Sequence, residues 1–219
     1  MNAFLPSDTV VLMSSVVLLA AVITLGYLVT GISHRRLARL LGWLMTSAAI
    51  AASHGICVEE AAGYRMVSLI LTLLCGMKVV VAVEAQGAKT PRLEFLPWLV
   101  FCVGWLGMRI ETFSGLCKGR RDDWFVYVKK GSLRLVVGLV FLLLACAVSR
   151  LSTDSMSLPI KKITVTLLMF VGFSLAVHFG IINLMAGCWR RAGADCRSMF
   201  RAPLASYSLR EFWGRRWNI

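Results

Sequence analysis

The chain has 219 residues, of which 58% are hydrophobic and 16% are charged, whereas a soluble domain carries about a quarter charged residues. The apolar residues form long uninterrupted runs, which excludes a soluble globular protein and leaves no room for a separate soluble domain. The net charge of +13 does not indicate a nucleic-acid partner, because no aromatic and basic domain lies outside these runs. We therefore expect one all-α, polytopic transmembrane domain over residues 1–219.

Five apolar runs have the length that a helix needs to cross about 30 Å of hydrocarbon. They cover residues 9–33, 40–58, 64–84, 131–149 and 163–189. No Lys or Arg precedes the first run, and a secretory signal peptide would need such a basic flank. The first run is therefore interpreted as a retained membrane helix, and the sequence predicts about five spans. Lys78, inside the third run, is expected to snorkel to the headgroups or to contact a phosphate.

One apolar segment, residues 95–108, holds only 14 residues, with Pro97 near its start. A span needs about 20 residues, so this length is typical of a re-entrant or interfacial segment. If the segment does not cross, 20 of the 24 Lys and Arg residues lie on one side of the membrane, and if it crosses the split is 9 against 15. The positive-inside rule favours the first arrangement. It predicts an integral membrane protein with its N-terminus outside and its C-terminus in the cytoplasm.

Cysteine and histidine do not form a recognisable ligand pattern. The seven cysteines are odd in number, contain no CxxC pair and lie mostly in apolar runs, where cysteine behaves as a small hydrophobe. The three histidines, His34, His54 and His178, are scattered. The sequence therefore supports neither a disulfide framework nor a zinc site, and we expect no metal and no cofactor.

The C-terminal tail, residues 203–219, is predicted to be an interfacial helix on the cytoplasmic side. Ser208 is a good N-cap, and Glu211 three residues later completes a capping box. Tyr207 and Phe212 occupy the two positions of a hydrophobic staple. A pairing of Glu211 with Arg215, four residues on, is also expected. An amphipathic helix lying in the headgroup zone would explain the tail without any catalytic role.

Residues 208–218, Ser-Leu-Arg-Glu-Phe-Trp-Gly-Arg-Arg-Trp-Asn, support a second interpretation. This stretch resembles the signature of the membrane-bound O-acyltransferase superfamily, in its wax-synthase-like branch. Weaker similarities lie upstream in the expected order, at residues 76–78, 105–108, 178–180 and 189–190. The resemblance thus extends from about residue 65 to the end of the chain.

The resemblance implies a polytopic enzyme that transfers an acyl group from acyl-CoA, a co-substrate, to an alcohol acceptor, as a wax ester synthase does. Such chemistry needs a base, oxyanion donors and cations for the CoA phosphates. By position, Asn218 would be an auxiliary catalytic residue that orients the reacting groups. The remaining motif side chains would bind substrate: Glu211, Phe212, Trp213, Arg215, Arg216 and Trp217.

The resemblance also implies a catalytic histidine downstream of the motif, whereas the chain ends at Ile219. We therefore expect the front part of a longer protein, or one half of a split enzyme whose C-terminal half is a separate chain. His178 is a further catalytic candidate, although it lies about 16 Å along the helix axis from Trp189. The alternative to acyl transfer is a non-enzymatic protein that binds membrane lipids or acts as a scaffold. No inverted repeat favours a transporter.

Overall fold

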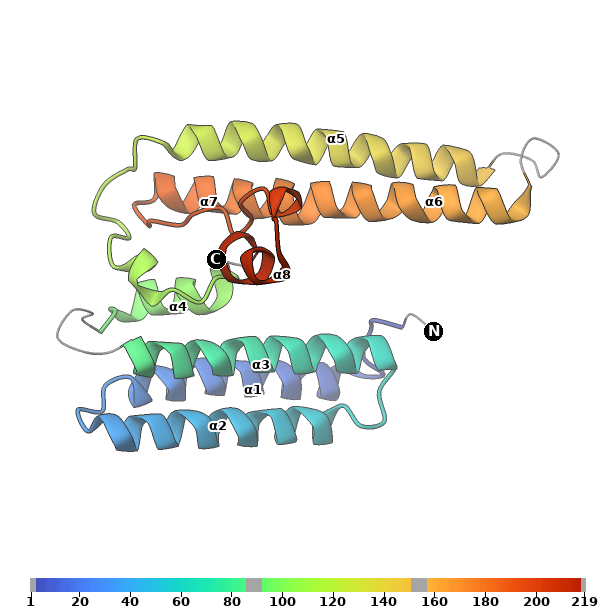
Figure 1. The fold of residues 1–219 in the computed structure, drawn as a ribbon. Helices are drawn as coiled ribbons and strands as arrows, with labels where there is room; N and C mark the ends of the chain where they lie inside the picture. Colours follow the sequence, from blue (N-terminus) through green and yellow to red (C-terminus); the bar gives the residue numbers. More distant parts are fainter. Residues whose placement is uncertain (1–2, 86–91, 151–156, 218–219) are drawn as a thin grey trace. The chain divides into compact units, whose positions relative to one another are not determined.

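A computed structural model describes residues 3–85, 92–150 and 157–217 of the chain (Figure 1). The described part contains helices and one isolated bridge but no β-strand, so the predicted all-α class is confirmed. The chain forms two compact units, Met1–Ser114 and Gly115–Ile219.

Within the described ranges, four helices are long and apolar enough to cross a membrane, as judged by length and composition. They are Thr9–Val29, Ala62–Ala85, Trp124–Arg150 and Leu158–Arg191. These helices are compatible with the predicted membrane protein. The predicted run 40–58 forms a helix as well, but this helix starts with three arginines in its first two turns and is not one of the four.

The first unit contains three long helices side by side: α1 (Thr9–Val29), α2 (Arg35–Ile56) and α3 (Ala62–Ala85). Hydroxyl groups join their buried faces. The Tyr64 hydroxyl donates to Ser15 Oγ at 3.1 Å, and the Oγ atoms of Ser53 and Ser68 lie 3.1 Å apart. Small hydroxyl side chains allow helices to approach closely and to hydrogen-bond where no water competes.

A short helix, α4 (Phe95–Gly104), and a 3₁₀ turn, η1 (Ile110–Phe113), complete this unit. Ten residues of α-helix measure about 15 Å, half of what a span requires. The Trp98 indole nitrogen attaches α4 to α1 by donating to the Ile23 carbonyl at 3.0 Å.

Lys78 of α3 holds the C-terminal end of α4. Its side chain is fully buried, so the predicted snorkelling to the headgroups does not occur. Its Nζ donates to the carbonyl oxygens of Phe101 at 2.7 Å, Trp105 at 2.6 Å and Gly107 at 3.1 Å. An ammonium group has three protons to donate, and the last carbonyls of a helix have no partner within the helix. Lys78 therefore satisfies backbone groups that lipid could not.

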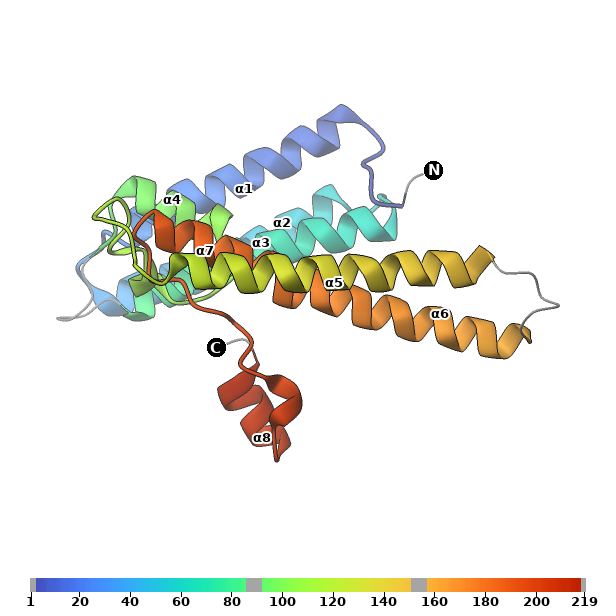
Figure 2. The same ribbon diagram turned by 90° about the horizontal axis from the view of Figure 1, so that it is seen from above.

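The second unit is built on a helical hairpin. Helix α5 (Trp124–Arg150) runs beside a continuous helix made of α6 (Leu158–Phe173), η3 (Ser174–Ile181) and α7 (Ile182–Arg191), and both views show this pairing (Figures 1 and 2). A Cβ on Gly138 of α5 would lie 2.5 Å from the Ala176 backbone nitrogen. Glycine at this position therefore sets the close approach of the two helices.

Two boundaries differ from the sequence prediction. Helix α5 begins at Trp124 rather than at residue 131. The uncharged run starts only after Lys129 and Lys130, whereas the helix includes both lysines. The tail is not one helix over residues 203–219. It contains a 3₁₀ turn, η4 (Pro203–Ala205), then α8 (Leu209–Glu211) and η5 (Phe212–Arg216), and in Figure 2 the α8 segment stands off the α5–α7 hairpin.

Candidate functional site

The tail begins as the sequence predicts, with Ser208 as an N-cap. Its Oγ accepts a hydrogen bond from the Glu211 backbone nitrogen at 3.1 Å. The Glu211 carboxylate accepts in turn from the Tyr207 backbone nitrogen at 3.0 Å, one residue before the position that a standard capping box uses. The predicted hydrophobic staple does not form, because the Tyr207 side chain is 96% exposed.

A π-helical turn follows the cap and changes the partner of Glu211. The Trp217 backbone nitrogen donates to the Phe212 carbonyl at 2.8 Å, which is the five-residue spacing of a π-helix. This wider turn brings Arg216, rather than the expected Arg215, to Glu211, with Arg216 Nε 2.7 Å from Oε1. The Tyr207 N–H and then the Arg216 guanidinium lower the pKa of the Glu211 carboxyl below its ordinary value.

An aromatic cluster joins the motif to η3. The rings of Phe200 and Trp217 lie 4.6 Å apart between centroids, and Phe212 stacks on Trp217 at 5.2 Å. His178 contacts both partners of the first pair, at 5.4 Å from Phe200 and 5.7 Å from Trp217. A short antiparallel bridge between Phe200 and Trp217 fixes this arrangement, with the Arg201 nitrogen donating to the Arg216 carbonyl at 2.8 Å.

His178 therefore lies against the motif. The tail folds back along the hairpin after residue 191. His178 and the motif are therefore close, although His178 lies about 16 Å from Trp189 along the helix axis. Its Nδ1 is buried, and among the residues that the structure describes it has no hydrogen-bond partner. The residue belongs to the π-helical segment η3, and π-helical turns are rare and frequent at functional sites. A histidine with an unused ring nitrogen is available for proton transfer.

A cavity of about 530 Å³ opens beside this cluster. Arg216 of the motif lines it, together with four side chains of the hairpin and the returning chain that can recognise an anion or an amide: Lys130, Arg134, Asn183 and Arg201. The Phe200 ring supplies an apolar wall. Asp123 also lines the cavity, but its carboxylate is bound by Arg190.

Arg190 at the end of α7 neutralises this carboxylate and anchors the returning chain. Its Nε and Nη2 bind the two oxygens of Asp123 at 2.7 and 2.9 Å, and its Nη1 binds Asp195 at 2.6 Å and the Cys196 carbonyl at 2.8 Å. Burial raises the pKa of the Asp195 carboxyl, but hydrogen bonds from Arg190 and Arg197 outweigh it, so the pKa is lower than usual. The cavity consequently keeps an excess of positive charge.

The structure thus brings together only some of the predicted site residues. Phe212 and Trp217 join His178 in the aromatic cluster. Arg216 lines the cavity, and Glu211 is held beside it by the ion pair with Arg216. The Trp213 ring packs on Phe212 at 4.9 Å and on Trp217 at 6.2 Å between centroids, but Trp213 does not line the cavity. Arg215 is exposed and does not line the cavity either. Asn218 lies outside the described residues.

Four residues of the cavity wall were not predicted from the sequence: Lys130, Arg134, Asn183 and Arg201. Lys130 and Arg134 are four residues apart, which places them on one face of α5, and this spacing was the available signal.

In the described parts of the chain, no three His, Cys, Asp or Glu side chains are grouped so that they could hold a metal ion. Comparison with protein-family models, with curated proteins and with solved structures finds no match for this chain.

Proposed function

We propose that this protein is a membrane-bound O-acyltransferase of the wax-synthase-like type, which transfers an acyl group from acyl-CoA to an alcohol. The observation that carries the proposal is the cationic cavity beside His178, with Arg216 of the motif in its wall. Three cations of its wall, Lys130, Arg134 and Arg201, form no ion pair within the described residues. They suit the phosphates of a CoA thioester, since charge-assisted hydrogen bonds to phosphate are strong. The neighbouring aromatic rings suit the adenine or the start of the acyl chain.

In the proposed reaction, the hydroxyl oxygen of the acceptor attacks the thioester carbonyl carbon. The C–O bond of the ester forms, the C–S bond breaks, and the hydroxyl proton passes through a base to the departing thiolate. His178 is the described histidine that lies against the motif and has a free ring nitrogen. We assign it the role of that base, in place of the downstream histidine that the resemblance implies.

The membrane arrangement is part of the same proposal. Five spans are α1, α2, α3, α5 and the continuous helix α6–α7, while residues 95–108 enter the membrane without crossing it. The shortness of α4 and the capture of its terminal carbonyls by Lys78 support a re-entrant segment, since broken helices are tolerated at membrane depth only where protein satisfies their backbone. The N-terminus is then outside, and the tail is in the cytoplasm, where acyl-CoA is found.

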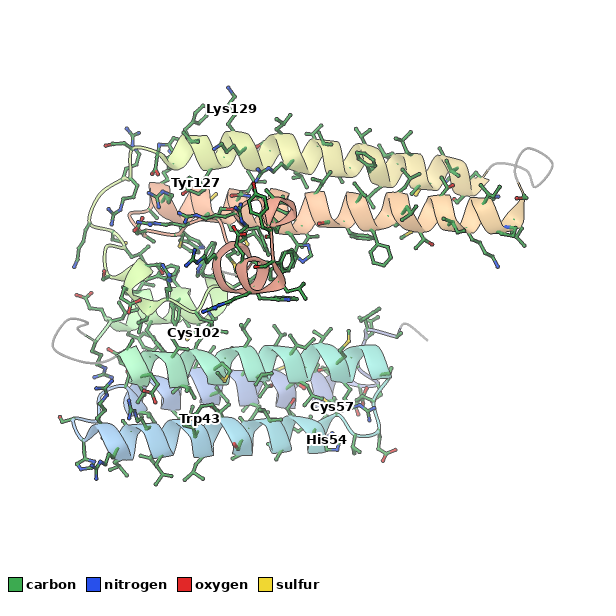
Figure 3. All side chains as sticks on the ribbon, viewed as in Figure 1. Trp43, His54, Cys57, Cys102, Tyr127 and Lys129 are labelled. Carbon is green, nitrogen blue, oxygen red and sulfur yellow. The ribbon has the colours of Figure 1, made fainter. Side chains whose placement is uncertain are left out.

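Donor binding is tested with the purified full chain in a maltoside detergent, using radiolabelled palmitoyl-CoA and, separately, palmitate. We expect palmitoyl-CoA to bind and R134Q/R201Q to weaken it by tenfold or more, because each lost bond to a charged group costs about 1.5–3 kcal/mol. The control R36Q/K129Q removes two exposed cations that do not line the cavity, and Lys129 projects away from α7 (Figure 3). Equal binding of palmitate and palmitoyl-CoA would indicate a lipid-binding protein instead.

Turnover is tested with the same donor and a long-chain alcohol, in membranes that contain only this chain. Ester formation that H178A abolishes, with palmitoyl-CoA binding retained, supports His178 as the base. Ester formation that persists in H178A refutes this role.

A further inference from the structure

A second cavity in the Gly115–Ile219 unit shares no residue with the first. It has a volume of about 310 Å³ and is lined by six residues, three of them cationic: Gly115, Lys118, Gly119, Arg120, Arg121 and Gly193. Ligand pockets begin at about this size. The proposed acyl transfer makes no use of this cavity.

The walls of this cavity are held in place by backbone hydrogen bonds between two loops. The Cys117 nitrogen donates to the Ala192 carbonyl at 2.8 Å, and the Arg121 nitrogen donates to the Arg190 carbonyl at 3.0 Å. Gly193 has a φ of 103° and would place a Cβ 2.5 Å from the Gly115 carbonyl oxygen, so only glycine fits there. The cationic loop is therefore a built part of the fold.

The charge of this loop is not compensated. Lys118, Arg120 and Arg121 are exposed, and within residues 3–85, 92–150 and 157–217 none of them forms an ion pair with a carboxylate. The Arg121 Nε donates to the Gly193 carbonyl at 3.3 Å, which fixes its guanidinium at the cavity. The adjacent carboxylate of Asp123 is bound by Arg190. Three positive charges thus converge on a cavity that has no anion of its own.

The start of the apolar helix α5 beside the cavity indicates that the anion it binds belongs to a membrane lipid. Trp124 and Phe125 begin α5 directly after the cationic loop, with their rings 5.6 Å apart, and Phe125 is 59% exposed. The Arg191 guanidinium lies 5.2 Å from the Trp124 ring centre. Exposed aromatic side chains at the end of a membrane helix mark the headgroup zone. With α5 as a membrane span, as proposed above, the cavity lies at the depth of the lipid phosphates.

We propose that the cavity formed by the loop 115–121 and Gly193 binds the phosphate monoester headgroup of an acidic phospholipid. A monoester carries close to two negative charges at neutral pH, which Lys118, Arg120 and Arg121 neutralise. Arginine binds phosphate through two parallel N–H groups, and two of the three cations are arginines. The acyl chains of the lipid extend from the cavity along the apolar surface of α5.

The test uses the full chain in maltoside detergent, which contains no phosphate, and three probes. These are dioctanoyl phosphatidic acid, dioctanoylglycerol and inorganic phosphate, each titrated by calorimetry. We expect phosphatidic acid to bind and dioctanoylglycerol not to bind. The triple variant K118Q/R120Q/R121Q should weaken phosphatidic acid by roughly 100-fold, since three cations near an anionic headgroup contribute about fivefold each.

A matched variant separates a specific site from net charge. R36Q/K129Q/R210Q removes three exposed cations that line neither cavity, and it should bind phosphatidic acid as the wild type does. Equal weakening in both triple variants, or inorganic phosphate binding as tightly as phosphatidic acid, would overturn the proposal. Binding of palmitoyl-CoA should be unchanged in K118Q/R120Q/R121Q, so the two proposals can fail separately.

Discussion

Replacing Lys78 by methionine should release the short helix α4 from the first unit. Methionine fills much of the volume of the lysine stem but donates no hydrogen bond. Two buried carbonyls and one partly buried carbonyl would then lose their donor, at a cost of at least about 1 kcal/mol each. The contact of the ammonium with the Phe101 ring, at 4.0 Å from the ring centre, would also be lost. Methionine avoids the desolvation cost of the buried ammonium, which offsets part of this loss of stability. A net cost of about 3 kcal/mol remains.

Cys102 reports this release directly, because it lies on α4 (Figure 3) and is only 2% exposed. If local opening limits its reaction with a maleimide, a loss of about 3 kcal/mol raises the labelling rate by roughly 100-fold. Labelling is read at each cysteine by mass spectrometry after digestion. Cys57 at the end of α2 (Figure 3) and Cys196 in the second unit are fully buried and serve as internal controls.

The matched variant for this experiment is Lys129→Met, which removes an exposed lysine from α5. It should leave the labelling of Cys102 at the wild-type rate. A Lys78→Met chain in which Cys102 also reacts within twofold of the wild-type rate would refute the claim that Lys78 holds α4. Faster labelling of Cys57 and Cys196 together with Cys102 would refute it too, since this pattern indicates global unfolding.

Three further predictions concern the helical hairpin and the tail. Arg190→Met should lower the free energy of unfolding by about 2 kcal/mol, after allowance for the partly exposed carboxylates, and thermal unfolding should show a lower midpoint. Adding Asp195→Asn should restore part of the loss. Gly138→Leu should cost about 1–3 kcal/mol by forcing the hairpin apart, whereas Gly42→Ala, which has nothing within 4 Å of the added Cβ, should be tolerated in the same unfolding assay. The Glu211 carboxyl has a folded-state pKa below its ordinary value of about 4.3, so it stabilises the tail above that pH and stops doing so as the pH falls through the lower value. Tryptophan fluorescence between pH 7 and pH 3 should show this transition, and Glu211→Gln should remove it.

Apolar run length predicted the helices well but not where they begin. A run of uncharged residues ends at the first Lys or Arg, whereas a helix continues past it when the charged head can reach water. Helix α5 extends through Lys129 and Lys130 for this reason. The role of Lys78 was missed for a related reason. Its three acceptors are carbonyls on residues 101–107, and backbone carbonyls have no signature in a sequence.

The tail divides into a part that local rules determine and a part that they do not. The Ser208 cap depends on residues within three positions, and it is present. The choice of Arg216 over Arg215 depends on a π-helical turn, which the bridge from Phe200 to Trp217 accompanies. A π-turn is rarely stable by itself, so a rule based on α-helical spacing selects the wrong arginine unless the distant strand of chain is known.

The approach of His178 to the motif follows from how the chain turns after α7. The Arg190 guanidinium binds Asp123 before α5 and Asp195 after α7. It therefore fixes the direction in which residues 192–200 leave the hairpin. This direction returns the tail toward η3, where Trp217 meets His178. A sequence reports the separation of His178 and Trp217 along the chain but not this reversal. The one signal was chemical: Arg190 ends an apolar helix in a chain with only 11 acidic residues, and such an arginine needs a carboxylate partner.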